Sequence, residues 1–173
     1  EIGTGRWIMQ EALDVRAATV DIIEPVQRRI VDYAENPWHL VQWSSSTPAD
    51  GVECELVAID SFEALDKLPP HGLQGKIVLT GLSPYHQGRR WYEKGALGVI
   101  VDAGVADCPE ATAWTKFGWG GMPVNEGTAR CVLSRAEGEK LRALVKEGPV
   151  KLKVQVITHR HVGTHDVVNG LVL

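Results

Sequence analysis

The sequence lacks the features that would place the protein in a membrane or on a nucleic acid. Its apolar runs fall well short of the roughly 20 residues that a bilayer-spanning helix needs. Its 18 lysine and arginine residues are outnumbered by 22 aspartate and glutamate residues, which gives a net charge of −4. A mildly acidic chain does not have the electrostatic footprint of a nucleic-acid-binding protein. We therefore expect neither a membrane nor a nucleic acid as a partner.

Cysteines are scarce, and their spacing excludes a simple zinc knuckle. Cys54, Cys108 and Cys131 lie far apart, and none belongs to a Cys-x-x-Cys pair. Cys54 and Cys131 fall in apparent strands, and free cysteine is among the residue types most often buried, so we expect both to be core residues. Asp107 and Glu110 beside Cys108 oppose formation of a thiolate, so a cysteine nucleophile is not favoured there.

Two sequence motifs of enzymes are also absent. No Gly-x-Ser-x-Gly occurs, so the chain has no nucleophile elbow of a serine hydrolase. The glycines Gly118, Gly120 and Gly121 are not followed by Lys-Ser or Lys-Thr, and no helix is predicted to start there. These glycines therefore indicate a loop and not a phosphate-binding site.

Short alternating or fully apolar segments predict about seven strands. The clearest is 52–59, in which Val52, Cys54, Leu56 and Ala58 share one face while Glu53 and Glu55 occupy the other. The remaining candidates are 18–23, 38–43, 77–79, 97–101, 129–133, 150–157 and 167–173.

Helices are expected at 6–16, 61–68, 84–94 and after residue 134. Ser61 is a capping residue, and Ser134-Arg135-Ala136-Glu137 reads as a capping box in which the serine caps the helix and the glutamate reaches back. The order of strand 77–79, helix 84–94 and strand 97–101 predicts a βαβ unit with parallel strands. The fold class is therefore mixed α/β: a small β-sandwich or open barrel of about seven strands, with two or three helices at its edges.

Four motifs follow one another in the order seen in protease-associated (PA) domains. They are 73–79 (LQGKIVL), 92–101 (YEKGALGVIV), 121–124 (GMPV) and 134–144 (SRAEGEKLRAL). Over residues 51–158 the chain thus resembles a PA domain. It departs from the family pattern at 80–84 (TGLSP), where many PA domains have a glycine, a cysteine and a phenylalanine.

Residues 165–172 (HDVVNGLV) resemble the segment that re-enters the catalytic domain in two-zinc aminopeptidases with an inserted PA domain. The resemblance implies three parts: residues 1–44, an N-terminal helix and connector of the flanking peptidase domain; 45–158, the PA-type domain; and 159–173, a return segment. It also implies an extracytoplasmic or secreted location. Because the sequence starts at Glu1 and not at methionine, we expect a processed product or a piece of a longer chain.

The resemblance implies no catalytic or metal-binding residue in this chain, since the zinc ligands of the family follow the return strand. Zinc is expected in the parent catalytic domain, and no cofactor is expected here. His159, His161 and His165, with Asp166, form one cluster of ligand-like composition. Two histidines at a spacing of two on a strand can chelate zinc, but a polar strand end is the interpretation that we favour.

Aromatic residues supply the candidate interaction surface. Trp114, Phe117 and Trp119 lie among glycines in a long loop, and Tyr85 lies near the start of the βαβ helix. These four side chains either face a substrate or partner, or pack on a small core or a neighbouring domain. Arg89 and Arg90 add either polar contacts or solvated surface charge.

We interpret the chain as a non-catalytic PA-type domain that serves as a lid or a docking module for a peptide or protein substrate beside a peptidase domain. Two alternatives stay open: a free-standing protein-interaction domain, and a small metal-dependent hydrolase that uses His159, His161 and His165. The terminal strand 167–173 also offers an apolar edge for self-association.

Overall fold

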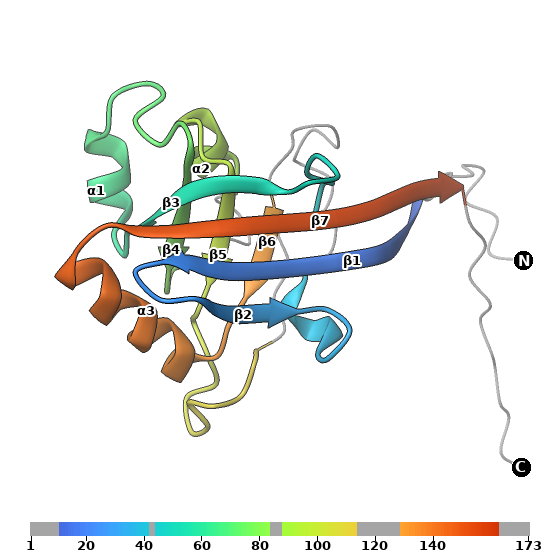
Figure 1. Cartoon of the computed structure of the whole chain (residues 1–173). Coiled ribbons are helices and arrows are strands. Elements are labelled where there is room, and N and C mark those ends of the chain that lie inside the picture. Colours follow the sequence, from blue (N-terminus) through green and yellow to red (C-terminus); the bar gives the residue numbers. More distant parts are fainter. Residues whose placement is uncertain (1–10, 42–43, 84–87, 114–128, 163–173) are drawn as a thin grey trace, which may run out of the picture.

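The computed structural model describes residues 11–41, 44–83, 88–113 and 129–162. Within these residues, seven strands form one mixed sheet in the order β2-β1-β7-β3-β4-β5-β6 (Figure 1). The mixed α/β class is thereby confirmed, with the described strands in one sheet and not in two stacked sheets. The strands are β1 (Glu11–Glu24), β2 (Arg28–Asp32), β3 (Val52–Ala58), β4 (Lys76–Thr80), β5 (Gly98–Val101), β6 (Ala129–Val132) and β7 (Val150–Val162).

The antiparallel half of the sheet is built on β7. Its residues alternate in burial: Val150, Leu152, Val154 and Val156 are buried, while the lysines between them are exposed. Each such buried side chain contributes on the order of 1.5–3 kcal/mol relative to an exposed one. β7 pairs with β1 from Glu11↔Val162 to Glu24↔Lys151 and with β3 on its other edge, which makes it the centre of this half.

The other half consists of parallel strands joined by short helices. β3 pairs with β4, β4 with β5 and β5 with β6, all in parallel. Residues of β4 and β5 are buried on both faces, as expected for parallel strands covered on both sides. The predicted βαβ unit is confirmed as β4–α2–β5, with α2 at Gly88–Glu93. A second unit, β3–α1–β4, uses α1 at Phe62–Lys67.

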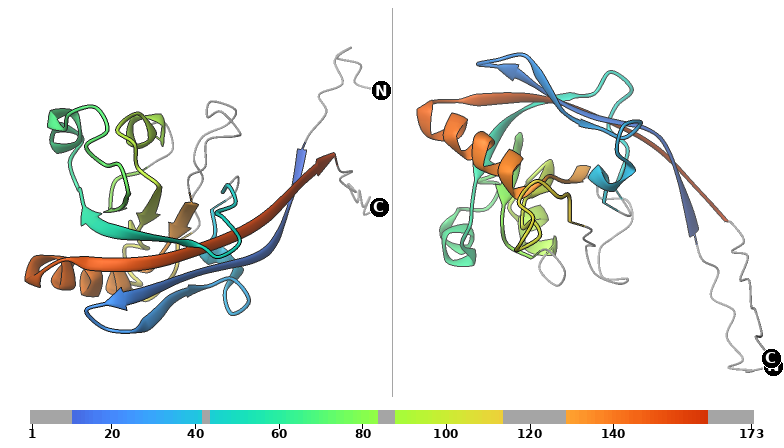
Figure 2. Two further views of the ribbon diagram at one scale, coloured as in Figure 1. Left: turned by 45° about the horizontal axis from the view of Figure 1, so that its top comes forward. Right: turned by 90° about the horizontal axis from the view of Figure 1, so that it is seen from below.

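The helices cover opposite faces of the sheet. α1 and α2 lie on one face, where Leu65 and Trp91 are buried against Val78, Val99 and Val101 (Figure 1). The longer helix α3 (Arg135–Glu147) lies on the other face and buries Leu141 among the apolar residues of β1, β3 and β7 (Figure 2). The parallel strands lie between the two apolar clusters and contribute side chains to both.

The segment after β2 returns to the far edge of the sheet. A short 3₁₀ helix, η1 (Pro37–His39), precedes an isolated bridge between Leu40 and Cys131 of β6. The Val41 amide donates to the Arg130 carbonyl at 2.9 Å, and the fully buried Ser44 hydroxyl donates to the same carbonyl at 3.0 Å. These bonds tie the segment that follows β2 to β6, so the two ends of the strand order are connected through this segment.

Two predictions of local structure are wrong. Residues 11–16 lie in β1 and not in a helix, because pairing with β7 satisfies their backbone. Residues 38–41 do not form a strand, because Asn36 accepts a hydrogen bond from Trp38 N at 3.1 Å and Pro37 occupies the first turn of η1. Residues 6–10, 42–43, 84–87 and 167–173, on which other expectations fall, lie outside the described residues.

The predicted capping box of α3 is half confirmed. Ser134 is the N-cap, and its hydroxyl accepts from Glu137 N at 3.2 Å. The Glu137 carboxylate does not return to the cap; it pairs with Arg28 of β2 and with Lys140 at 3.3 Å. The glutamate therefore connects α3 with the edge strand instead of closing the box.

Replacing Ser134 with alanine should destabilise the protein by about 1 kcal/mol, because the Glu137 amide loses its acceptor at the start of α3. Urea denaturation followed by circular dichroism measures the change. Ser134→Thr keeps the hydroxyl and should retain most of the stability. An unchanged midpoint for the alanine variant would show that the cap contributes nothing in solution.

Candidate functional site

The parallel strands β3 to β6 end at one edge of the sheet, the position at which ligands bind in open α/β folds. Two aspartates stand at these strand ends: Asp60 lies two residues after β3, and Asp102 follows β5 directly; Gly81 follows β4. Arg142 of α3 reaches the same place. We call Asp60, Asp102 and Arg142 the carboxylate cluster.

The Arg142 guanidinium binds both carboxylates of the cluster. Its Nε donates to Asp60 Oδ2 at 3.1 Å, and its Nη2 donates to both Asp60 Oδ1 at 2.5 Å and Asp102 Oδ1 at 3.1 Å. The other oxygen of Asp102 also contacts the guanidinium. Asp60 accepts a further bond from the Gly81 amide at 2.9 Å. Asp102 is only 4% exposed, so its charge depends on Arg142 for compensation.

The backbone of α3 comes very close to this cluster. Gly138, one helical turn before Arg142, lies against the Asp102 carboxylate, and a side-chain carbon at residue 138 would overlap with it. Glycine is therefore required here by close approach, although alanine is the better helix former. The site that open α/β folds offer to ligands is filled by the chain's own arginine.

Arg142 also lowers the pKa of Asp60, chiefly through the hydrogen bonds from its guanidinium. Because the folded pKa lies below the ordinary value of 3.8, this pairing stabilises the fold above that pH and is lost as the pH falls through the folded pKa. Asp60 is half exposed, which limits the contribution. The cluster thus holds α3 to the strand ends and offers no unpaired base or nucleophile.

Replacing Arg142 with methionine should cost about 3 kcal/mol or more, because Asp102 would stay buried without a cationic partner. Arg135→Met is the matched control: Arg135 is an exposed arginine of the same helix, and its loss should change stability by less than about 0.5 kcal/mol. Chemical denaturation of both variants measures the difference. Equal losses would contradict a role of the cluster in holding α3.

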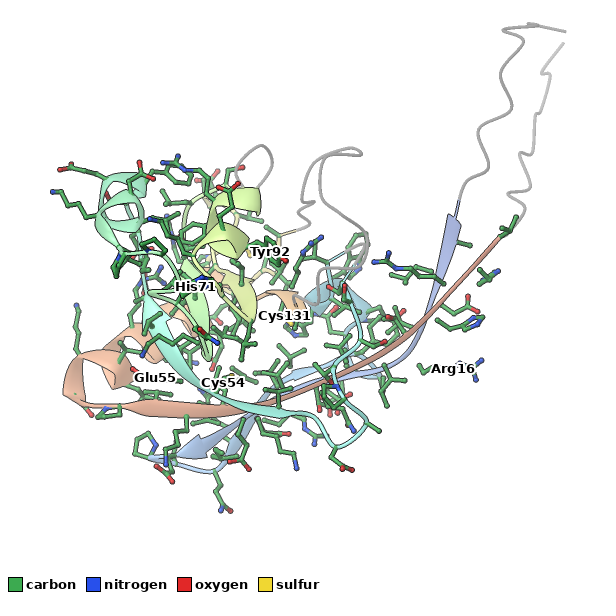
Figure 3. The ribbon with its side chains drawn as sticks, turned by 90° about the horizontal axis from the view of Figure 1, so that it is seen from above. Arg16, Cys54, Glu55, His71, Tyr92 and Cys131 are labelled. Carbon is green, nitrogen blue, oxygen red and sulfur yellow. The ribbon has the colours of Figure 1, made fainter. Side chains whose placement is uncertain are left out.

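The cysteines behave as core and surface thiols. Cys54 and Cys131 are buried, as predicted, and burial raises the pKa of each thiol to about 12. A thiol with such a pKa is almost entirely protonated near neutral pH and is a poor nucleophile or metal ligand. Cys108 is free and exposed. Figure 3 shows Cys54 and Cys131 in the body of the sheet, on different strands.

Two hollows lie outside the carboxylate cluster. An apolar hollow of about 230 Å³ is lined by Cys54, Ile77, Leu97 and Val154, and its Thr47 hydroxyl is hydrogen-bonded to the backbone of β7. A polar hollow of about 350 Å³ on the outer face of the sheet is lined by side chains of both signs, among them Asp21, Arg29, Asp50 and Lys153. Neither hollow combines a nucleophile with a base.

His159 and His161 lie at the end of the sheet, where β1 and β7 continue without another strand among the described residues. We call residues 11–14 of β1 and 159–162 of β7 the arm; Arg16, at the base of this ribbon, is labelled in Figure 3 far from the labelled residues of the body. His159 and His161 share a face, with ring centroids 5.7 Å apart. Within the described ranges, no group of three or more His, Cys, Asp and Glu side chains is arranged to hold a metal ion.

The predicted interaction residues Tyr85, Trp114, Phe117 and Trp119 lie outside the described residues, as do His165 and Asp166. Arg90 is described: it pairs with Asp66 and stacks over the Phe62 ring at 4.6 Å, so it joins α2 to α1.

Sequence reasoning missed the carboxylate cluster. The available signal was an aspartate at the end of two apolar strands; the sequence does not indicate which helix supplies the arginine.

The comparison with solved structures finds proteins that share this fold. No family model matches the chain, and no curated protein matches it. Among solved structures, a peptidase M28 precursor from Shewanella amazonensis SB2B has a TM-score of 0.64 at 17% identity over 88% of this chain. An aminopeptidase from Aneurinibacillus sp. strain AM-1 has a TM-score of 0.57 at 19% identity over 87%, and a zinc aminopeptidase from Bacillus subtilis has 0.56 at 14% over 88%.

These peptidases are longer than this chain, which spans 37%, 33% and 35% of their respective lengths. The fold is therefore shared with about a third of each of these peptidase structures. None of the described helices has the length and apolar character needed to cross a membrane.

Proposed function

We propose that this chain is a non-catalytic, PA-type module of a zinc-aminopeptidase-like protein, in which it acts as a lid or docking surface for peptide or protein substrates. The observation that carries the proposal is the pairing of Glu11 with Val162 at the tip of the arm. The described chain enters and leaves at neighbouring positions. Neighbouring ends are what allows one domain to be inserted into a loop of another.

The likeness to three peptidase structures supports the same interpretation. Each of them shares the fold over nearly the whole of this chain and over about a third of its own length. A module that accounts for a third of such a protein leaves room for a separate catalytic domain. The similar Bacillus subtilis structure is described as a zinc aminopeptidase. We propose that zinc is bound in that catalytic domain and not by this chain.

The apolar core suggests a boundary for the module other than the division expected between residues 44 and 45. β1 and β2 contribute Val20, Ile22 and Val31 to the same apolar cluster as β7 and α3. We therefore propose that the inserted unit runs from residue 11 to residue 162 and that the flanking segments lead to the peptidase domain.

The isolated chain should hydrolyse no aminoacyl p-nitroanilide and should contain no stoichiometric zinc, because the carboxylate cluster is closed by Arg142 and both core thiols are protonated. Activity assays with and without a chelator, together with elemental analysis of the purified chain, measure this. Hydrolysis that a chelator abolishes would favour the metal-dependent hydrolase that uses His159, His161 and His165.

In the protein that contains this chain, replacing residues 11–162 with an Asn-Gly turn should leave hydrolysis of a small aminoacyl anilide largely intact and change the rate on longer peptides. The paired ends make a two-residue turn sufficient to rejoin the chain. Steady-state kinetics on substrates of increasing length provides the measurement. A rate that changes equally for all lengths, or for none, would contradict the lid and docking role.

A further inference from the structure

One face of the arm brings together an aspartate and two histidines. Asp14 of β1 stands directly opposite His159 of β7, and His161 follows two residues later on the same face. Asp14 Oδ1 lies 3.3 Å from His161 Nε2, and the two imidazole rings are nearly parallel at a tilt of 16°. The contact is diagonal across the strand pair, a position from which long side chains on adjacent strands still interact.

Both ring nitrogens of His161 face oxygen atoms. Nδ1 lies 3.3 Å from the Val162 carbonyl, and Nε2 faces the Asp14 carboxylate and is shielded from solvent. A neutral imidazole carries one N–H, so either tautomer would direct a lone pair at an acceptor. The doubly protonated ring alone presents a proton to each oxygen. At 3.3 Å the Asp14 contact is an ion pair and not a well-aligned hydrogen bond.

We propose that Asp14 and His161 form a proton-dependent latch that fastens the two strands of the arm to each other. When His161 is protonated, the ion pair closes across β1 and β7. When His161 loses its proton, this attraction disappears, and the backbone bonds between β1 and β7 remain.

The residues around the latch are His159, Ala12, Arg160 and Arg16. His159 stacks on His161 from the same strand and stands directly opposite Asp14. Ala12, which is uncharged, is the direct partner of His161 on β1. Arg160 alternates to the opposite face of β7. Arg16 lies beyond Asp14 at the register shift of β1.

The direction of the pH dependence follows from the geometry. Asp14 raises the pKa of His161 above its ordinary value of 6.5, with a smaller contribution from the Val162 carbonyl. A folded-state pKa above the unfolded value means that the latch stabilises the arm fully below that ordinary value. Its contribution is lost as the pH rises through the folded pKa.

Titration of the imidazole resonances by NMR tests the proposal on the full chain, in the presence of a chelator so that trace metal does not alter the midpoints. In the parent chain, His161 should titrate at a higher midpoint than in the Asp14→Asn variant. Asp50→Asn, which removes an exposed carboxylate from the body, should leave the His161 midpoint unchanged. His161→Gln assigns the resonance.

Hydrogen exchange then tests the fastening itself. Protection of the Ala12 and His159 amides, which face the partner strand, should fall relative to that of the Val154 amide in the body as the pH rises through the His161 midpoint. The same ratio should be flat in Asp14→Asn and in His161→Gln. Equal His161 midpoints in the parent and Asp14→Asn chains, or a ratio that changes alike in all three chains, would overturn the proposal.

Discussion

The pairing of β1 with β7 is the interaction on which the rest of the structure depends. β7 presents Leu152 and Val154 to the core, and their partners on β1, Ile22 and Val20, lie in the same apolar cluster. Because β7 also pairs with β3, it connects the antiparallel hairpin β1–β2 to the parallel strands. Without this ladder, β2 and the segment that contains η1 would not be held near β6. The bridge from Leu40 to Cys131 and the bond from Val41 to Arg130 would then be lost.

The elements that could be predicted from the sequence are those with a local pattern strong enough to specify their structure. β3 and β7 alternate polar and apolar residues over their buried lengths, and Ser134 marks the start of α3 as its N-cap residue. The first residues of β1 carry no such pattern, and their conformation is imposed by a partner strand about 150 residues away in the sequence. The turn at Asn36-Pro37 was visible, but its capping bond overrides the strand-like residues after it.

The candidate site was less accessible to sequence reasoning than the fold. Two aspartates after apolar strands indicate polar groups at a common sheet edge once the strands are known to be parallel. That Arg142 compensates both, and that Gly138 admits α3 to the contact, depends on how a helix lies across strands that are distant in sequence. The same constraint explains why this edge is structural here: a guanidinium already occupies the place where a ligand would bind.

The arm differs from the body in what holds it. In the body, each strand is supported by apolar side chains on at least one face, whereas the arm is a two-stranded ribbon with polar residues on the face that carries Asp14, His159 and His161. Isolated two-stranded ribbons are marginally stable in water, so cross-strand side-chain pairs decide how firmly the strands stay together. The described chain enters and leaves through this ribbon, so the proposed latch acts where the two ends of the described residues meet.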